Sequence, residues 1–164
     1  MDSIRIFGYK SFKKLSVQLH PINLLIGANG AGKSNFLSLF EMLGNIYEKR
    51  LGAYVAQVGG VDKFLYQGRK VTDRIAVNLL IAKSEYDLAL LESDGKLIVE
   101  REVVGCYDDV CPLDLVRKNV ITEFQSESSL KDHKEEDLSN YISQIRKFHF
   151  HDTGRRSPFT ADSH

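Results

Sequence analysis

Hydrophobic and polar residues alternate in two stretches near the start of the chain, residues 3–7 and 14–19. This period of two predicts strands that have one buried and one exposed face. Residues 22–26 follow as a short, mostly apolar run, of the kind that a buried strand needs. We therefore expect three strands before residue 27.

The pattern becomes helical after residue 32. Large apolar side chains then recur every three or four positions: Phe36, Leu39, Phe40, Leu43, Ile46 and Tyr47. This spacing predicts an amphipathic helix of about four turns over residues 33–47. Residues 52–60 are apolar but interrupted by glycines, so a connection is expected there.

Three further strand-like runs occupy residues 74–82, 86–92 and 96–104. The last two are separated by a tight turn centred on Asp94 and Gly95, a pair that favours a two-residue hairpin. The spacing predicts an antiparallel meander.

The run that ends at Glu92 can be compared with an apolar strand found in many ATPases, which ends in an acidic residue that polarises the attacking water. No Asp precedes Glu92, however, and a turn follows it directly. Both features favour a plain hairpin strand.

Charged residues cluster between residues 107 and 140, where few large apolar side chains occur. We expect a solvated insertion there, which is either partly helical or mobile. Helical spacing returns over residues 138–145, and a strand is predicted at residues 147–151. The expected organisation is a core with a meander at 1–106, an insertion at 107–140, and a helix, a strand and an open end at 141–164.

Composition narrows the class of protein only slightly. Of 164 residues, 43% are hydrophobic, which supports a buried core, and 22 basic residues balance 22 acidic ones. The bulk charge therefore gives no argument for binding nucleic acid or an anionic membrane, although DNA stays open as a partner. No apolar run reaches the length of a membrane span, and a cytoplasmic location is expected.

Two cysteines, Cys106 and Cys111, are separated by four residues. They have no second Cys or His pair at metal-ligand spacing, so reduced thiols are expected rather than half of a metal site.

The most informative chemistry lies between the apolar run and the helix. Residues 27–34 fit the phosphate-loop pattern G-x-x-x-x-G-K-[ST], with Gly27, Gly32, Lys33 and Ser34 at every fixed position. The variable positions are occupied by Ala28, Asn29, Gly30 and Ala31. In this pattern glycines allow backbone N–H groups to surround phosphates, the Lys reaches the β- and γ-phosphates, and the Ser hydroxyl binds Mg²⁺. The helix that follows adds its positive N-terminal dipole. The segment predicts an ATP and Mg²⁺ site, with Asn35 at its border.

The opening residues 4–12, the run at 22–26 and the loop that continues into Asn35 together resemble the N-terminal lobe of ABC-type ATPases. Within these, the chain is similar to the RecF-like and structural-maintenance-of-chromosomes branch, especially to predicted bacterial AAA-labelled ATPases. Their aromatic-[Lys/Arg]-Ser element is matched by Tyr9, Lys10 and Ser11. The resemblance implies an α/β P-loop NTPase fold with a mixed sheet, incomplete in this chain.

The resemblance also implies roles for individual residues. Lys10 and Ser11 are expected near the nucleotide phosphates, with a solvent-facing turn as the alternative. Relatives place a Mg²⁺-contacting glutamine after the strand that corresponds to residues 147–151; no Gln follows here, so His151 or Asp152 would take its place. His149 and His151 share a strand face, where structural histidines are commoner than metal ligands.

Three elements of an ABC-type engine do not occur in the sequence: a Ser-Gly-Gly-like signature, an apolar strand ending in Asp-Glu, and a switch His after it. We therefore expect the N-terminal part of a longer ATPase, which binds nucleotide with negligible turnover. Hydrolysis would require a complementary half or a homodimer, since phosphoryl transfer needs a positioned water and stabilised equatorial oxygens.

Two other functions stay open. One is a non-catalytic nucleotide-binding interaction module, and the other is a small kinase or GTPase-like domain with the same loop. The lack of an Asn/Thr-Lys-x-Asp guanine-reading motif counts against a GTPase.

Overall fold

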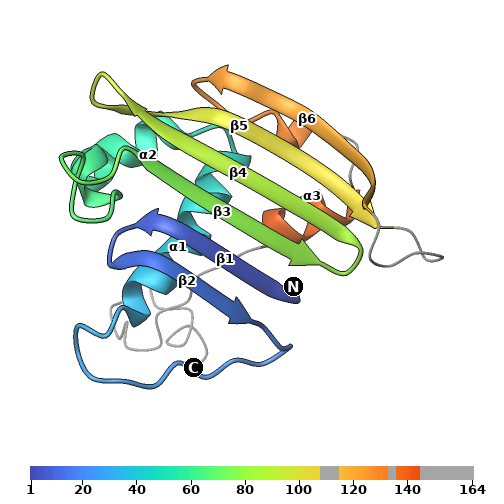
Figure 1. The fold of residues 1–164 in the computed structure, drawn as a ribbon, viewed down its shortest axis with the longest axis horizontal. Helices are drawn as coiled ribbons and strands as arrows, with labels where there is room; N and C mark the ends of the chain where they lie inside the picture. The colour runs from blue at the N-terminus through green and yellow to red at the C-terminus, as the bar shows by residue number, and fades with distance from the viewer. Residues whose placement is uncertain (108–114, 133–135, 145–164) are drawn as a thin grey trace, which may run out of the picture.

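The N-terminal alternation folds as a β-hairpin at one edge of a sheet (Figure 1). In the computed structural model, which describes residues 1–107, 115–132 and 136–144, β1 (Ser3–Tyr9) pairs with β2 (Phe12–Gln18) in antiparallel register. Ile6 lies opposite Leu15, and a two-residue turn joins Tyr9 to Phe12. The alternation therefore places one apolar row of each strand on the same face.

The predicted meander is confirmed and extends the same sheet. Its strands follow one another in chain order: β3 (Arg74–Ile81), β4 (Ser84–Ser93), β5 (Lys96–Tyr107) and β6 (Leu115–Gln125). Asp94 and Gly95 have φ values of 50° and 78°, as a two-residue hairpin turn requires. The run that ends at Glu92 is the hairpin strand β4, as predicted. Because β3 pairs with β1, the six strands take the order β2-β1-β3-β4-β5-β6 and are all antiparallel.

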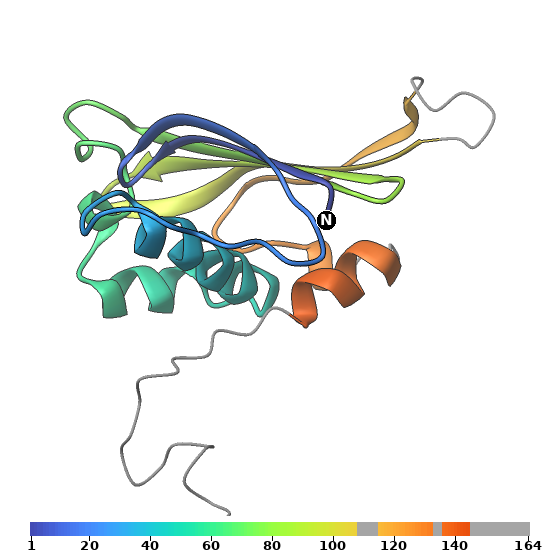
Figure 2. The ribbon, with the colours of Figure 1, turned by 90° about the horizontal axis from the view of Figure 1, so that it is seen from below.

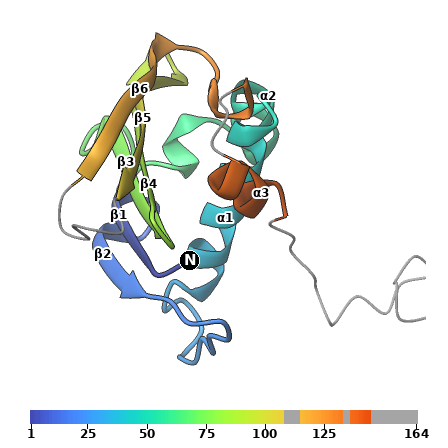
Figure 3. The same ribbon diagram turned by 90° about the vertical axis from the view of Figure 1, so that its right-hand side faces the viewer.

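The described helices cover a single face of this sheet (Figures 2 and 3). They are α1 (Lys33–Tyr47), α2 (Leu51–Val58) and α3 (Glu136–Ser143), together with the 3-10 turns Val61–Lys63 and Leu130–Asp132. None of the helices in the described ranges combines the length and apolar character needed to cross a membrane.

The core lies between the helices and the sheet. The predicted helix at 33–47 is confirmed with the same bounds, and its buried apolar side chains are Phe36, Leu39, Met42, Leu43 and Ile46. They pack against inward-facing residues of the sheet such as Ile4, Ile6, Val77, Leu79 and Leu88. Apolar side chains that repeat every 3.6 residues along the helix thus pack against apolar side chains that repeat every two residues along the strands.

The prediction of a buried strand at residues 22–26 is wrong. This segment forms no strand, and Ile22, Leu24 and Ile26 are 89%, 81% and 83% exposed. A strand requires a hydrogen-bonding neighbour, and none of the strands that the structure describes pairs with these residues. The expected mixed sheet that holds the phosphate-loop strand is accordingly replaced by an antiparallel sheet.

Two other expectations are corrected. The connection expected at 52–60 contains α2, which ends where Gly59 adopts a left-handed φ of 104°. The polar insertion expected at 107–140 supplies β6, which pairs with β5 at the other edge of the sheet. The helix expected at 138–145 is present as α3.

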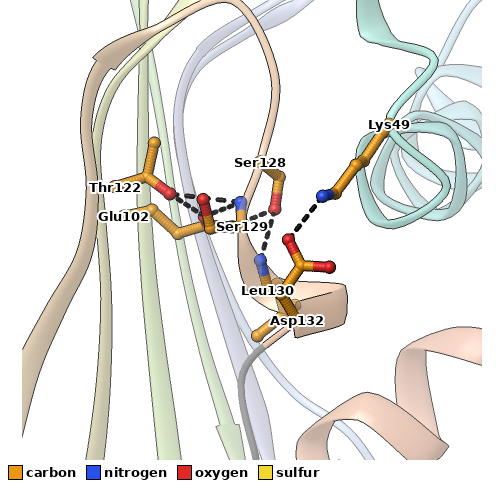
Figure 4. A network of polar contacts seen from close by, with 7 residues as sticks. All are labelled: Lys49, Glu102, Thr122, Ser128, Ser129, Leu130 and Asp132. Atoms are coloured by element: carbon orange, nitrogen blue, oxygen red, sulfur yellow. Dashed lines mark hydrogen bonds and ion pairs between the residues drawn. The ribbon is translucent and has the colours of Figure 1, made fainter.

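A buried carboxylate ties the end of β6 to the sheet (Figure 4). Glu102 of β5 is fully buried, and its oxygens accept hydrogen bonds from the hydroxyls of Tyr86, Thr122 and Ser128 and from the backbone N–H of Ser129. Four donors satisfy a charge that would otherwise be costly to bury. The network fixes the segment that leads to Leu130–Asp132, where Lys49 pairs with Asp132.

Several sequence expectations lie outside the described residues. They include the strand at 147–151, His149, His151, Asp152 and Cys111.

Candidate functional site

Residues 27–34 form the turn that leads into α1. The backbone N–H of Ala31 donates to the carbonyl of Ala28 at 3.2 Å, and Gly30 and Gly32 have left-handed φ values of 84° and 91°. A Cβ on Gly32 would lie 3.1 Å from the ring of Phe12 and 3.2 Å from Oγ of Ser11. Gly32 is thus required both by its backbone conformation and by the close approach of the β1–β2 turn.

The first turn of α1 presents unpaired backbone donors. Its first helical hydrogen bond runs from the N–H of Phe36 to the carbonyl of Gly32, at 2.9 Å. The N–H groups of Lys33, Ser34 and Asn35 therefore have no partner within the helix. No acidic residue lies in this turn, and no side chain caps it. The positive end of the helix is left available for an anion.

A hollow of about 350 Å³ lies directly at this helix end. It is lined by Asn29, Gly30, Gly32, Lys33, Ser34 and Asn35. Five of the eight predicted loop residues therefore line one concave surface together with Asn35, and the exposed Ser34 is among them. Gly27 enters the site through its carbonyl group.

Lys33 folds back over the loop that precedes it. Its Nζ donates to the carbonyls of Gly27 and Ala28, at 2.6 Å and 2.7 Å. These two bonds hold the ammonium group beside the hollow, where a phosphate oxygen could replace a carbonyl as its partner.

The turn between β1 and β2 is bound to the same part of α1. Asn35 Nδ2 donates to Oγ of Ser11 at 2.9 Å, and Lys10 Nζ donates to Oγ of Ser38 at 2.8 Å. Lys10 adopts a left-handed φ of 47°, and its Nζ lies 5.4 Å from the ring centroid of Tyr9. The structure thus brings both residues of the upstream element to the start of the helix.

Sequence reasoning missed Ser38, which joins the two elements. Ser38 Oγ donates to the carbonyl of Asn35, so its contact with the buried Tyr9 hydroxyl has Tyr9 as donor. Burial raises the pKa of Tyr9 above its ordinary value. A polar residue on the apolar face of a predicted helix was the only available signal.

A second, larger cleft of about 800 Å³ adjoins the hollow and shares Asn35 with it. Basic side chains dominate its charged lining: Lys10, Lys63, Arg69 and Lys70, against the single carboxylate of Asp62. Asp62 pairs with Arg69 and accepts the Arg69 N–H at 2.9 Å, which holds the loop in shape. The site as a whole is therefore suited to an anionic ligand that is longer than a single phosphate.

Comparison with known proteins identifies the family of this chain. A family model described as an AAA ATPase domain matches residues 1–153. The chain belongs to this family. The match confirms the resemblance to the N-terminal region of AAA-labelled ATPases, and membership indicates nucleotide binding. No curated protein matches the chain.

The predicted metal ligands are not brought together among the residues that the structure describes. Ser34 lies in the hollow, whereas His151 and Asp152 fall outside the described ranges. Within those ranges, no group of three or more His, Cys, Asp or Glu side chains is arranged to hold a metal ion. Any Mg²⁺ at Ser34 would take its other ligands from phosphate oxygens and water, as Mg²⁺ does in such sites.

Proposed function

We propose that this AAA ATPase domain binds ATP with Mg²⁺ at the start of α1. The observation that carries the proposal is the hollow at the helix end, where the free N–H groups of the first turn and the Nζ of Lys33 converge. Backbone donors, a helix dipole and one mobile cation form the usual recognition set for a chain of phosphates.

Other residues are given roles in the same site. We assign Lys33 to the β- and γ-phosphates, Ser34 to Mg²⁺, and Lys10 and Ser11 to a second tier of contacts. The larger cleft beside Asn35 has room for the remaining part of the nucleotide. The likeness to the RecF and structural-maintenance-of-chromosomes branch supports the assignment of Lys10 and Ser11.

We further propose that hydrolysis requires a complementary ATPase half that a partner supplies. The sequence has no Asp-Glu strand and no signature element to orient water and enclose the γ-phosphate. The exposed run at residues 22–26 supports this proposal, because pairing with a further strand would bury its apolar side chains and satisfy its backbone. A non-catalytic nucleotide-binding module is the alternative, and it predicts no turnover with any partner.

Calorimetric titration of the chain with ATP and Mg²⁺ tests the binding proposal. Lys33→Ala removes the charged donor of the loop and should weaken binding by at least about 2 kcal/mol, or roughly thirtyfold. Lys83→Ala, in the turn between β3 and β4, is the matched control and should bind as the parent does. Equal affinities for the parent and Lys33→Ala would reject the assignment.

A further inference from the structure

The described helices leave one face of the sheet uncovered (Figure 3), and the residues of this face line a groove. It has a volume of about 620 Å³ and runs across β2, β1, β3, β4 and β5. None of the residues that line it also lines the phosphate-loop hollow or the adjoining basic cleft. The groove is thus a separate feature from the proposed nucleotide site.

Strand register defines the floor of the groove as two adjacent rows of side chains. The first row, read across the sheet, is Lys14, Phe7, Ala76, Ala89 and Arg101. The second row is Ser16, Arg5, Asn78, Asp87 and Val103. Because neighbouring strands lie about 4.8 Å apart, the first row spans about 19 Å from Lys14 to Arg101.

The groove is deep at this point because two neighbouring positions of the first row are alanines. Ala76 and Ala89 face each other across β3 and β4, while Phe7 stands beside them on β1. The Phe7 side chain is 45% exposed, although the aromatic rings of the helix-facing side, such as Tyr9 and Phe64, are completely buried. The ring of Phe7 therefore borders a part of the sheet surface where the side chains are short.

Charge in the groove is strongly biased, although the chain as a whole has a net charge of zero. Arg5, Lys14 and Arg101 line it, against the one carboxylate of Asp87. That carboxylate already accepts the side-chain amide of Asn78 at 2.6 Å. The three basic side chains are exposed, and none of them forms an ion pair with a residue that the structure describes. Their charges are available to a ligand.

We propose that this groove binds single-stranded nucleic acid. Arg5 and Lys14 flank Phe7, one along the same strand and one directly across on β2, and Arg101 lies at the far end of the row. A base can stack on the ring of Phe7 while the cations contact the flanking phosphates. The part of the groove above Ala76 and Ala89 gives room for the unstacked base.

Two other polyanions fit the groove less well. An acidic peptide would use the three cations but would gain nothing from an aromatic ring as such. Duplex nucleic acid keeps its bases stacked, so the ring would find no free base face. Dependence on Phe7 therefore distinguishes the proposed ligand from both.

The test is fluorescence anisotropy of labelled oligothymidylate titrated with the full chain at low salt, without ATP. Phe7→Ala should weaken binding by about fivefold or more, in line with the loss of one stacked base, whereas Phe7→Tyr should keep the parent affinity. Alanine at Arg5, Lys14 or Arg101 should each lower the salt slope by about 0.7. The matched control is Lys13→Ala, since Lys13 is exposed on β2 but does not line the groove.

Lys33→Ala should bind the oligonucleotide as the parent does, which separates this groove from the phosphate loop. Far-UV circular dichroism of each variant checks that the fold is retained, and Phe7→Leu replaces Phe7→Ala if the latter unfolds. The proposal is overturned if Phe7→Ala and Phe7→Leu bind as tightly as Phe7→Tyr, if Lys13→Ala loses as much affinity as Lys14→Ala, or if duplex DNA or polyglutamate binds more tightly than the single strand.

Discussion

The side-chain amide of Asn35 donates a 2.9 Å hydrogen bond to the hydroxyl of Ser11, which links the first turn of α1 to the turn between β1 and β2. The bond from Lys10 Nζ to Oγ of Ser38 makes a second link, 2.8 Å long, one helical turn further on. The segment that contains the phosphate loop is therefore held between two elements whose relative position is fixed. A ligand in the loop would meet a preorganised helix end.

The link between Asn35 and Ser11 should be measurable as a coupling energy. In a double-mutant cycle of Ser11→Ala and Asn35→Ala, we expect a coupling of about 0.5–1 kcal/mol in the free energy of unfolding, which is the net contribution of one such bond. Urea denaturation of the four proteins measures it. Strict additivity would show that the bond contributes nothing.

Gly32→Ala should destabilise the chain. The new Cβ would approach Phe12 and Ser11 at 3.1–3.2 Å, and a left-handed φ of 91° would be imposed on alanine. Together these should cost about 1–3 kcal/mol. Gly44→Ala is the control: a Cβ there meets nothing within 4 Å, so the helix should gain about 0.5–1 kcal/mol. Thermal denaturation compares the two, and equal effects would contradict the geometry.

Glu102 and Glu100 lie two residues apart on β5 in opposite settings. Glu102→Ala leaves the hydroxyls of Tyr86, Thr122 and Ser128 without their buried acceptor and should cost about 2–4 kcal/mol. Glu100→Ala removes only a half-exposed pair with Arg74 and should cost less than about 1 kcal/mol. Chemical denaturation of both variants measures their free energies of unfolding. A loss of similar size in each would show that the Glu102 network contributes no more to stability than the exposed pair does.

Alkaline pH should destabilise the fold through its buried tyrosines. Burial, with a smaller contribution from the Glu41 carboxylate, raises the pKa of Tyr54 to about 12. The unfolded chain ionises Tyr54 near pH 10, so its stabilisation is complete below about pH 10 and is lost as the pH rises towards 12. Tyr9 and Tyr86 also have raised pKa values because they are buried.

The contribution of Tyr54 is isolated by Tyr54→Phe, which keeps the ring in contact with Phe64 at a centroid distance of 5.5 Å. From pH 9 to pH 11, the free energy of unfolding of the parent should fall more than that of Tyr54→Phe, by an amount on the order of 1 kcal/mol. Parallel pH profiles would contradict the raised pKa.

Local patterns in the sequence were sufficient for elements whose partners lie nearby. The bounds of α1 followed from a regular apolar face, and the turn at Asp94 and Gly95 followed from the backbone conformation that those residues favour. The phosphate-loop pattern at residues 27–34 could be recognised because its residues are contiguous in the sequence. In each case the determining interactions lie within a few residues of one another.

Elements whose character depends on distant partners were not predicted. Residues 22–26 are apolar enough for a strand but have no neighbour among the described strands. Glycines suggested a break over α2, although Gly52 lies inside the helix and Gly59 only ends it. Among the described strands, β6 pairs with β5 alone, and it leaves Val120 and Phe124 exposed. Its sequence therefore lacks a clear apolar face.

The candidate site also contains both kinds of residue, those that a local sequence pattern identifies and those that only tertiary packing brings in. The loop residues were predicted, whereas Ser38 and the loop bearing Arg69 enter the site only through tertiary packing.

We propose that this chain holds ATP at the phosphate loop without turning it over. The most direct measurement is to incubate the purified chain with ATP and Mg²⁺, separate it from free nucleotide by gel filtration, and identify the bound nucleotide by anion-exchange chromatography. We predict intact ATP with the parent and no bound nucleotide with Lys33→Ala. Recovery of ADP with continuing phosphate release would contradict the absence of turnover, and equal retention of ATP by the Lys33→Ala variant would contradict binding at the phosphate loop.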